Sequence, residues 1–160
     1  MLDFLLRCYE EVFGEGLGKT AEADRKTGGL KPEYVPYPHQ RQAIDLFMRN
    51  DGKLVMAHGT GSGKTIGAIM AFDAGRKAGI ARKALVVVPT GLRSNFAKKG
   101  VEKVTNDSVQ VFGSQQEVED GDHVGLENAN PETTFSIVGY EMFRKDPLRY
   151  MKVTGADTLI

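Results

Sequence analysis

The chain has 160 residues, and its 41% hydrophobic and 26% charged residues fit one globular domain with its own core rather than a disordered tail. Its 21 basic and 21 acidic side chains cancel, so the net charge gives no argument for a nucleic-acid partner. No apolar run reaches the roughly 20 residues that span a bilayer, and no basic leader opens the chain. We therefore expect a soluble protein with no membrane partner, located in the cytoplasm, or in the host-cell cytoplasm if its source is viral.

The first 31 residues differ in pattern from the rest of the chain. Apolar side chains at helical spacing from Leu2 to Phe13 predict a short amphipathic helix, which Gly14 ends. The stretch that follows, up to Lys31, is polar and rich in glycine, which is typical of a linker. We expect residues 1–31 to form an N-terminal helix with a flexible linker, and residues 32–160 to form the folded domain.

The first half of this domain is expected to alternate helices and strands. Residues 34–38 contain two prolines and are expected to be extended, whereas residues 40–49 place apolar side chains on one helical face. The run Lys53–Ala57 predicts a buried strand, and a glycine-rich loop leads from it to a helix from about Lys64 to Ala78. The wholly apolar run Ala84–Val88 predicts a second buried strand.

The second half repeats this alternation. A helix is expected from Leu92 to Val101, followed by a short strand at Val109–Phe112. Residues 115–134 show no sustained period and predict a long loop, Phe135–Val138 predicts a buried strand, and Asp157–Ile160 predicts the beginning of another. Strands that are apolar on both faces and alternate with helices predict an α/β fold, in which a parallel sheet carries helices on both faces.

Two glycine-rich segments, Gly14–Thr20 and Gly59–Thr65, have similar letters. A phosphate-binding loop needs a strand that delivers the chain, glycines that let backbone N–H groups converge on phosphate oxygens, and a helix whose positive end faces the anion. Only the second segment has a predicted strand before it and an apolar helix after it. We therefore predict the nucleotide site there, with His58 standing where the generic motif begins with glycine.

The chemistry of each position suggests its role in this loop. Backbone amides of residues 61–65 are expected to surround the β-phosphate of ATP, and Lys64 to neutralise the β- and γ-phosphates. The Thr65 hydroxyl is expected to bind Mg²⁺, so ATP and Mg²⁺ are the predicted cofactors and Lys64 and Thr65 the predicted catalytic residues. The predicted nucleotide-binding residues of the loop are Gly59, Thr60, Gly61, Ser62, Gly63, Lys64 and Thr65.

Three further segments narrow the choice among proteins with such loops. Pro38–Ala43 resembles the Q motif of superfamily 2 helicases and translocases, in which a glutamine reads adenine. This resemblance implies that Gln40 binds the base, for which an amide offers both a donor and an acceptor. It also implies that Tyr37 or Arg41 covers the base.

The other two segments resemble parts of the same superfamily that lie near nucleic acid. Pro89–Phe96 resembles motif Ia, and Ile137–Phe143 resembles the strand-to-helix segment before motif II in the chromatin-remodeler-like and restriction-enzyme-like branches. Nine Lys and Arg against two acids between residues 64 and 103 suit a phosphate contact, although such a run can also be an ordinary solvated face. The nucleic-acid contacts that these resemblances imply are Thr90, Arg93, Ser94, Asn95, Lys98, Gly139 and Tyr140.

The combined resemblance implies the first RecA-like lobe of an ATP-driven helicase or translocase, with nucleic acid as partner and DNA favoured over RNA. Members of this superfamily continue into an acidic motif and a second RecA-like lobe, so we expect the chain to be an inactive fragment of a longer parent. Within about three residues after Ile160 we expect an Asp-Glu pair, because fixing Mg²⁺ and orienting water need carboxylates. A phage packaging motor, a protein-remodelling ATPase and a non-hydrolysing nucleotide-binding fragment remain alternatives.

Overall fold

The computed structural model describes residues 29–57, 59–121 and 123–160. The predicted N-terminal helix, most of the predicted linker, the segment Gly14–Thr20 and His58 lie outside these residues. Among the described residues, no helix combines the length and the apolar character needed to cross a membrane.

Four parallel strands form the central sheet in the order β2-β3-β1-β4. The two inner strands pair along their full length, from Ala84 beside Phe135 to Val88 beside Gly139. Because the strands are parallel, their carboxyl ends meet at one edge, where α/β proteins bind their ligands. The strands are β1 (Ala84–Val88), β2 (Val109–Val111), β3 (Phe135–Gly139) and β4 (Thr158–Leu159).

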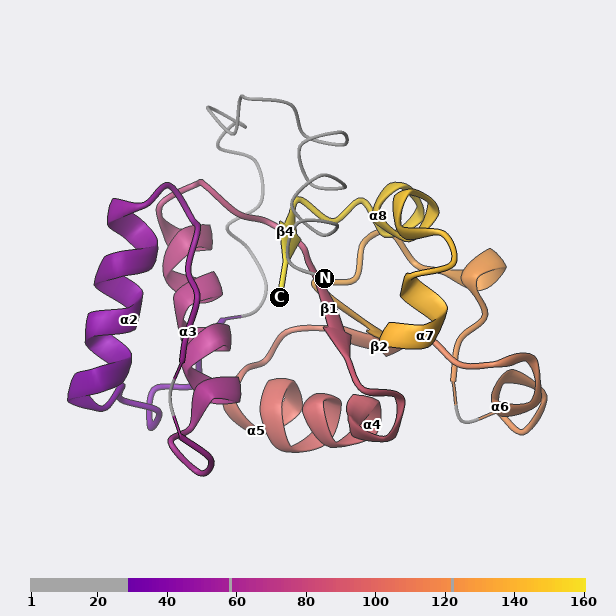
Figure 1. The fold of residues 1–160 in the computed structure, drawn as a ribbon, viewed down its shortest axis with the longest axis horizontal. Helices are drawn as coiled ribbons and strands as arrows, with labels where there is room; N and C mark the ends of the chain where they lie inside the picture. Colours follow the sequence, from indigo (N-terminus) through magenta and orange to yellow (C-terminus); the bar gives the residue numbers. More distant parts are fainter. Residues whose placement is uncertain (1–28, 58, 122) are drawn as a thin grey trace.

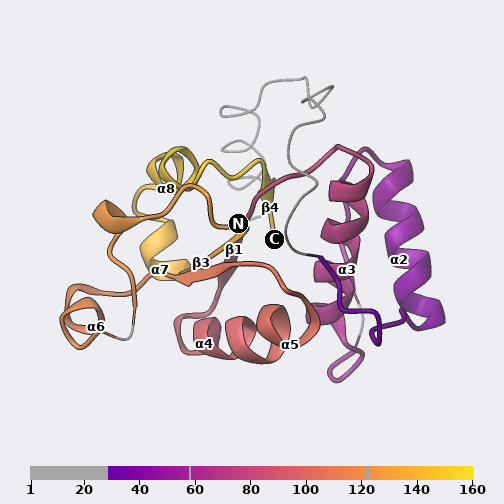
Figure 2. The same ribbon diagram turned by 180° about the vertical axis from the view of Figure 1, so that it is seen from behind.

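Helices cover both faces of this sheet (Figures 1 and 2). On one face, helix α3 (Lys64–Lys77) packs beside a helical run made of four short pieces. Phe72 of α3 meets Phe135 of β3 edge to face, with ring centroids 5.0 Å apart. The four pieces are η1 (Thr90–Leu92), α4 (Arg93–Asn95), the π-helical η2 (Phe96–Val101) and α5 (Glu102–Val104).

The opposite face is covered by helices α7 (Tyr140–Phe143) and α8 (Pro147–Thr154). Phe143, Tyr150 and Met151 of these helices pack against Leu85 and Val138 of the inner strands. The alternation of inward side chains along β1, with Leu85 on this face and Val86 on the other, explains why the strand is apolar on both faces. The predicted α/β fold is therefore confirmed.

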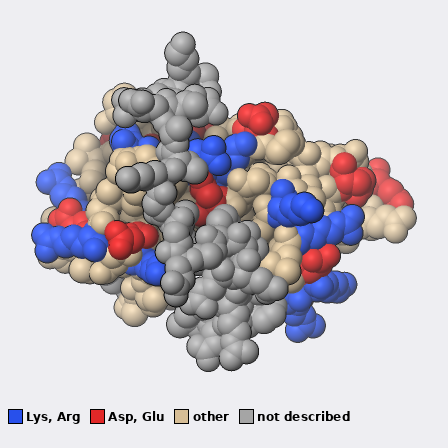
Figure 3. Space-filling view, turned by 90° about the horizontal axis from the view of Figure 1, so that it is seen from above, with Lys and Arg blue, Asp and Glu red and all other residues tan. Residues whose placement is uncertain are grey.

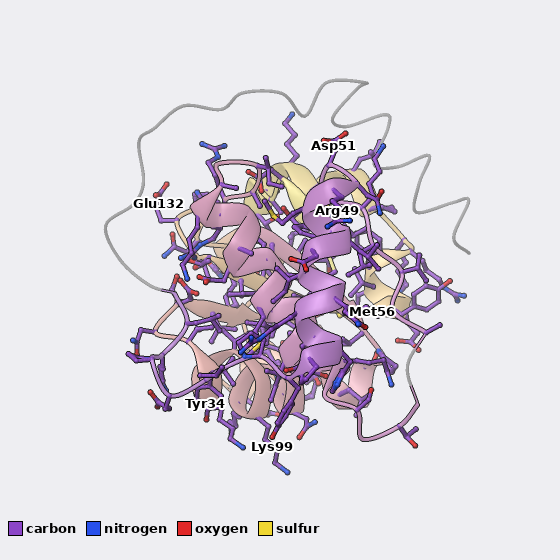
Figure 4. The ribbon with its side chains drawn as sticks, turned by 90° about the vertical axis from the view of Figure 1, so that its left-hand side faces the viewer. Tyr34, Arg49, Asp51, Met56, Lys99 and Glu132 are labelled. Carbon is purple, nitrogen blue, oxygen red and sulfur yellow. The ribbon has the colours of Figure 1, made fainter. Side chains whose placement is uncertain are left out.

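Helix α2 (Pro38–Arg49) lies on the outer side of α3, as both ribbon views show (Figures 1 and 2). Its Ala43 and Phe47 are buried, and a Cβ added at Gly75 of α3 would lie 3.0 Å from the Phe47 ring. Gly75 therefore permits the close approach of the two helices. Seen from this side, Arg49 and Asp51 lie toward one end of α2, whereas Tyr34 lies toward the other end (Figure 4).

The prediction of a buried strand at Lys53–Ala57 is wrong. These residues are in no strand, Val55 is 77% exposed, and Leu54 and Met56 are only partly buried. A strand needs a neighbouring backbone to receive its hydrogen bonds, and none of the four described strands pairs with this segment. Apolar content alone could not reveal this, because the confirmed strand at Ala84–Val88 has the same character.

The segment predicted as a long loop, residues 115–134, contains two short helices. α6 (Gln115–Glu119) begins with a capping box in which Ser114 and Glu117 exchange hydrogen bonds, and η3 is Leu126–Asn128. The Gln110 side chain bonds both the N–H and the carbonyl of Asn130, which ties the segment to β2. Long-range polar contacts thus order a stretch that has no hydrophobic period of its own.

The last residues of the predicted linker contact the domain. Leu30 forms an isolated antiparallel bridge with Thr105, and the Lys31 N–H donates to the Val104 carbonyl at 2.9 Å. The Gly29 N–H donates to the Asp107 carboxylate at 3.1 Å. Residues 29–31 therefore pack against the end of α5.

Candidate nucleotide-binding site and the adjoining loops

The glycine-rich loop leads directly into the N-terminus of α3. Gly61 has φ 77° and Gly63 has φ 76°, the left-handed region that glycine adopts without strain, and Gly63 is the N-cap of the helix. The first N–H groups of a helix lack partners within it, and the helix dipole favours an anion at this end. The loop therefore offers the backbone geometry that a phosphate group needs.

Two glycines of the loop have open space beside them. A Cβ added at Gly59 or Gly61 would meet no atom within 4 Å. The Lys64 ammonium donates to the Gly59 carbonyl at 2.8 Å, which holds its positive charge across the loop. Thr65 is exposed, and its methyl group faces Gly100, where an added Cβ would lie 3.1 Å away. These residues fit the binding of ATP with Mg²⁺.

Helix α2 contacts this loop through two successive side chains near its N-terminus. His39 Nε2 lies 2.9 Å from the Ser62 carbonyl oxygen, which can only accept, so the imidazole Nε2–H donates. Gln40 Nε2 donates to the next carbonyl, that of Gly63, at 3.2 Å. The structure thus brings Gln40 against the phosphate loop, 23 residues away along the chain.

The Gln40 amide is buried, with 4% of the residue exposed, and its oxygen accepts the Tyr37 N–H at 2.9 Å. Both ends of the amide therefore contact the protein backbone in this structure. Tyr37 is 66% exposed, and its ring stacks on His39 with centroids 6.0 Å apart. Arg41 donates from Nε to the Pro36 carbonyl at 3.2 Å. Tyr37 therefore presents an exposed ring beside His39, which itself contacts the loop.

A second set of predicted residues meets at the carboxyl ends of β1 and β3. A Cβ added at Gly139 would lie 2.7 Å from the Thr90 hydroxyl oxygen, so only glycine fits beside Thr90. The Thr90 hydroxyl donates to the Glu141 carboxylate, and this hydrogen bond lowers the pKa of Glu141. Tyr140 begins α7 and is partly buried. The two segments that resemble nucleic-acid-binding motifs are therefore in direct contact.

Arg93, a predicted nucleic-acid contact, is turned away from the surface in this structure. Arg93 is only 3% exposed. Its guanidinium donates to the Thr90 carbonyl at 2.8 Å, to the Phe112 carbonyl at 2.5 Å and to Glu117. The guanidinium therefore points into the protein. By contrast, Ser94, Asn95 and Lys98 are exposed on the same helical run.

Glu117 is a site residue that the sequence analysis missed. Its hydrogen bond from Arg93, and next the one from the Ser114 N–H, lower the pKa of Glu117 from 4.5 to about 2. The spacing Ser114-x-x-Glu117 is a capping box, and this signal could have located the start of α6. No sequence pattern indicated that the same carboxylate pairs with a cation 24 residues away.

Ion pairs join the basic zone, residues 64–103, to an acidic zone, residues 104–143, which has eight acids and no Lys or Arg. Arg76 forms an ion pair of 2.6 Å with Asp107, and Arg93 one of 2.5 Å with Glu117, so both cations meet carboxylates from the acidic zone. On the face seen in Figure 3, basic and acidic side chains are interspersed. Lys98 and Lys99 remain exposed, and Figure 4 shows Lys99 pointing outward. Among the cations of residues 90–101, Lys98 and Lys99 are therefore the two placed to contact a phosphate.

The fold and the loop define the class of protein. A parallel sheet with helices on both faces, and a glycine-rich loop that opens a helix with Lys64 and Thr65, are the features of a phosphate-loop nucleotide-binding domain. Residues 33–146 match the family model described as "Type III restriction enzyme, res subunit". The chain belongs to this family, which lies within superfamily 2, and the resemblance inferred from its motifs is confirmed.

A curated relative supports the same assignment. Over 80 residues the chain is 32% identical to the "Uncharacterized ATP-dependent helicase YqhH" of Bacillus subtilis (strain 168). The alignment covers 49% of this chain and 14% of that protein. The chain thus carries an ATP-binding domain of the superfamily 2 helicase type and aligns with a small part of its relative's length.

Proposed function

We propose that this chain is the ATP-binding lobe of a motor that couples ATP hydrolysis to movement on nucleic acid, with DNA favoured over RNA. The observation that carries the proposal is the position of the phosphate loop relative to the loops after β1 and β3. In both ribbon views the loop before α3 and the helical run that starts near α4 lie at the end toward which β1 points (Figures 1 and 2). Nucleotide and nucleic acid would then bind along one edge of the sheet.

The loop residues would act mainly by positioning and by electrostatics. Lys64 would exchange the Gly59 carbonyl for oxygens of the β- and γ-phosphates, and amides of residues 61–65 would hold the β-phosphate. When bound through Thr65, Mg²⁺ neutralises charge on the phosphates. Tyr37 offers its exposed ring to the base. Gln40 is proposed to donate to adenine with the second N–H of its amide, because only one N–H is needed for the Gly63 carbonyl.

The nucleic-acid side of the proposal rests on exposed donors. Ser94 and Asn95 carry neutral donors near the carboxyl end of β1, and Lys98 adds a positive charge one helical turn beyond Ser94. Thr90 lies beside them, and its hydroxyl would have to leave Glu141 to donate to a phosphate. Gly139 and Tyr140 adjoin them from the end of β3, and they are proposed to lie near the bound strand. A motor of this kind would also need carboxylates to hold Mg²⁺ and to orient the attacking water.

Two lysine variants of the full-length protein test the ATPase assignment. Lys64→Ala should abolish nucleic-acid-stimulated ATP hydrolysis, because no other described side chain of the loop brings positive charge to the γ-phosphate. Lys19→Ala, in the glycine-rich segment that resembles the loop, should hydrolyse ATP at the wild-type rate. Loss of activity in the Lys19 variant alone would place the nucleotide site in residues 14–20 instead of residues 59–65.

The same assay separates the alternatives. A protein that binds ATP in a Lys64-dependent manner but never hydrolyses it, with or without DNA, would be a nucleotide-binding module rather than a motor. Hydrolysis that no nucleic acid stimulates would favour a protein-remodelling ATPase. The family match favours the motor over a phage packaging enzyme.

A further inference from the structure

Arg93 joins three separate segments at the carboxyl edge of the sheet. Its Nε donates to the Thr90 carbonyl at 2.8 Å, its Nη1 to the Phe112 carbonyl at 2.5 Å, and its Nη2 to Glu117. Thr90 belongs to the turn after β1, Phe112 follows β2, and Glu117 lies on α6. We call residues 89–92 the Thr90 turn.

The pair with Glu117 keeps this buried cation in place. The Arg93 side chain is 3% exposed and the Glu117 side chain 33% exposed, so the carboxylate lies at the surface end of the pair. The second Glu117 oxygen accepts the Ser114 N–H at 2.7 Å, which fixes its direction. Removing Glu117 would leave the buried guanidinium with only the Thr90 and Phe112 carbonyls, neither of which carries a full negative charge. The Thr90 turn and α6 therefore depend on each other.

The Thr90 turn has two further hydrogen bonds. One lies within the turn, where the Leu92 N–H donates to the Pro89 carbonyl at 2.8 Å, and the other joins the Thr90 hydroxyl to Glu141 of α7. The helical run beyond the turn is anchored separately, because Ala97 and Val101 are buried in the core. Loss of the Arg93 contact would thus loosen the turn without moving the later part of the run.

We propose that Arg93 and Glu117 are a positioning pair, which orders the Thr90 turn for the phosphate backbone of a bound nucleic acid while neither side chain touches it. This inference rests on the proposed nucleic-acid function. It assigns a role to α6, a helix of the acidic zone that has no direct part in that function. The acidic helix acts as a support for the loop that binds a polyanion.

If the pair orders the turn, removing the Glu117 carboxylate should weaken nucleic-acid binding, whereas charge repulsion alone predicts stronger binding. Removing an acidic side chain near bound nucleic acid should strengthen binding through the reduced repulsion. If Glu117 orders the turn, its removal should instead weaken binding about tenfold, because the turn must then be ordered during association. Glu119 lies on the same helix, is exposed and bonds only Gln115 among the described residues, so Glu119→Ala is the matched control with the same charge change.

The experiment measures binding of the full-length wild type and variants to a short fluorescent DNA duplex at several salt concentrations. Glu117→Ala should bind about tenfold more weakly, with the slope of log affinity against log salt unchanged, since no phosphate contact of a cation is lost. Glu119→Ala should bind as well as the wild type or better. Glu117→Gln, whose single amide oxygen can still accept from Arg93 but then loses the bond from the Ser114 N–H, should recover part of the affinity.

A second measurement keeps the test independent of DNA binding. Hydrogen exchange of the Leu92 amide should accelerate in Glu117→Ala relative to Glu119→Ala, while the Val86 amide in β1 keeps its protection. Equal exchange in the two variants, or equal affinities, would overturn the positioning role. If the wild type bound no nucleic acid, the proposed function would fail, and the exchange comparison would still decide whether the pair orders the turn.

Discussion

Gly63 and Gly79 offer a matched pair of substitutions at the two ends of helix α3. Both have left-handed backbones, with φ 76° at Gly63 and φ 78° at Gly79. A Cβ at Gly63 would lie 2.9 Å from Gln40 Nε2, whereas a Cβ at Gly79 would meet nothing within 4 Å. Comparing the two alanine variants therefore separates the backbone strain common to both positions from the effects specific to Gly63, which are its contact with Gln40 and the conformation of the phosphate loop.

The strain should be similar at both positions, about 1–2 kcal/mol for an L-residue in the left-handed region. At Gly63 the Gln40 side chain must also turn away, which gives up its hydrogen bond to the Gly63 carbonyl at 3.2 Å and costs about 1 kcal/mol more. We expect Gly79→Ala to unfold about 1–2 kcal/mol more easily than the wild type. Gly63→Ala should lose about 2–3 kcal/mol, unless the loop escapes the strain by changing its conformation.

A change in the loop conformation of Gly63→Ala should be visible in its affinity for nucleotide. A loop that leaves the left-handed conformation at Gly63 no longer directs its amides at the phosphate, so affinity for a fluorescent ATP analogue should fall tenfold or more, on the order of 1.4 kcal/mol. Gly79→Ala should bind the analogue as the wild type does. If Gly63→Ala lost less stability than about 2–3 kcal/mol, which would show that the loop had moved, and still bound the analogue as Gly79→Ala does, the assignment of this loop as the phosphate site would be refuted.

Three other predictions concern single side chains. Gln40→Ala should weaken ATP binding more than GTP binding if its amide reads adenine, whereas equal losses in paired titrations would leave it only the role of holding the Gly63 carbonyl. Because the pKa of Glu117 is lowered in the folded protein, from 4.5 to about 2, its ionised form contributes stability above pH 4.5 that is lost as the pH falls toward 2. Unfolding measured against pH should therefore show a steeper acid-side loss in the wild type than in Glu117→Gln, and identical profiles would contradict the ion pair. Changing Lys98 and Lys99 together to Ala should lower the salt slope of DNA affinity by about 2, since each loses one phosphate, and an unchanged slope would make them an ordinary solvated face.

Local sequence was sufficient where the chemistry is itself local. Helix α3 begins at Lys64, after a loop whose glycines supply left-handed backbone, as its letters indicated. Helix α2 was expected from residue 40 and begins two residues earlier, at Pro38, because proline fits the first turn of a helix. The inner strands Ala84–Val88 and Phe135–Gly139 could be predicted because burial on both faces requires an unbroken apolar run. The class of nucleotide site followed from the same short segments.

The tertiary structure decided the features that depend on a distant partner. Residues 54–57 are as apolar as Ala84–Val88, but only the second segment has strands beside it to receive its hydrogen bonds. Arg93 stands where a phosphate-binding arginine was expected, yet its guanidinium is buried against the Phe112 carbonyl and pairs with Glu117, 24 residues later. A side chain's charge and its neighbours in sequence do not fix its direction, because desolvation and pairing depend on which residues the fold brings together.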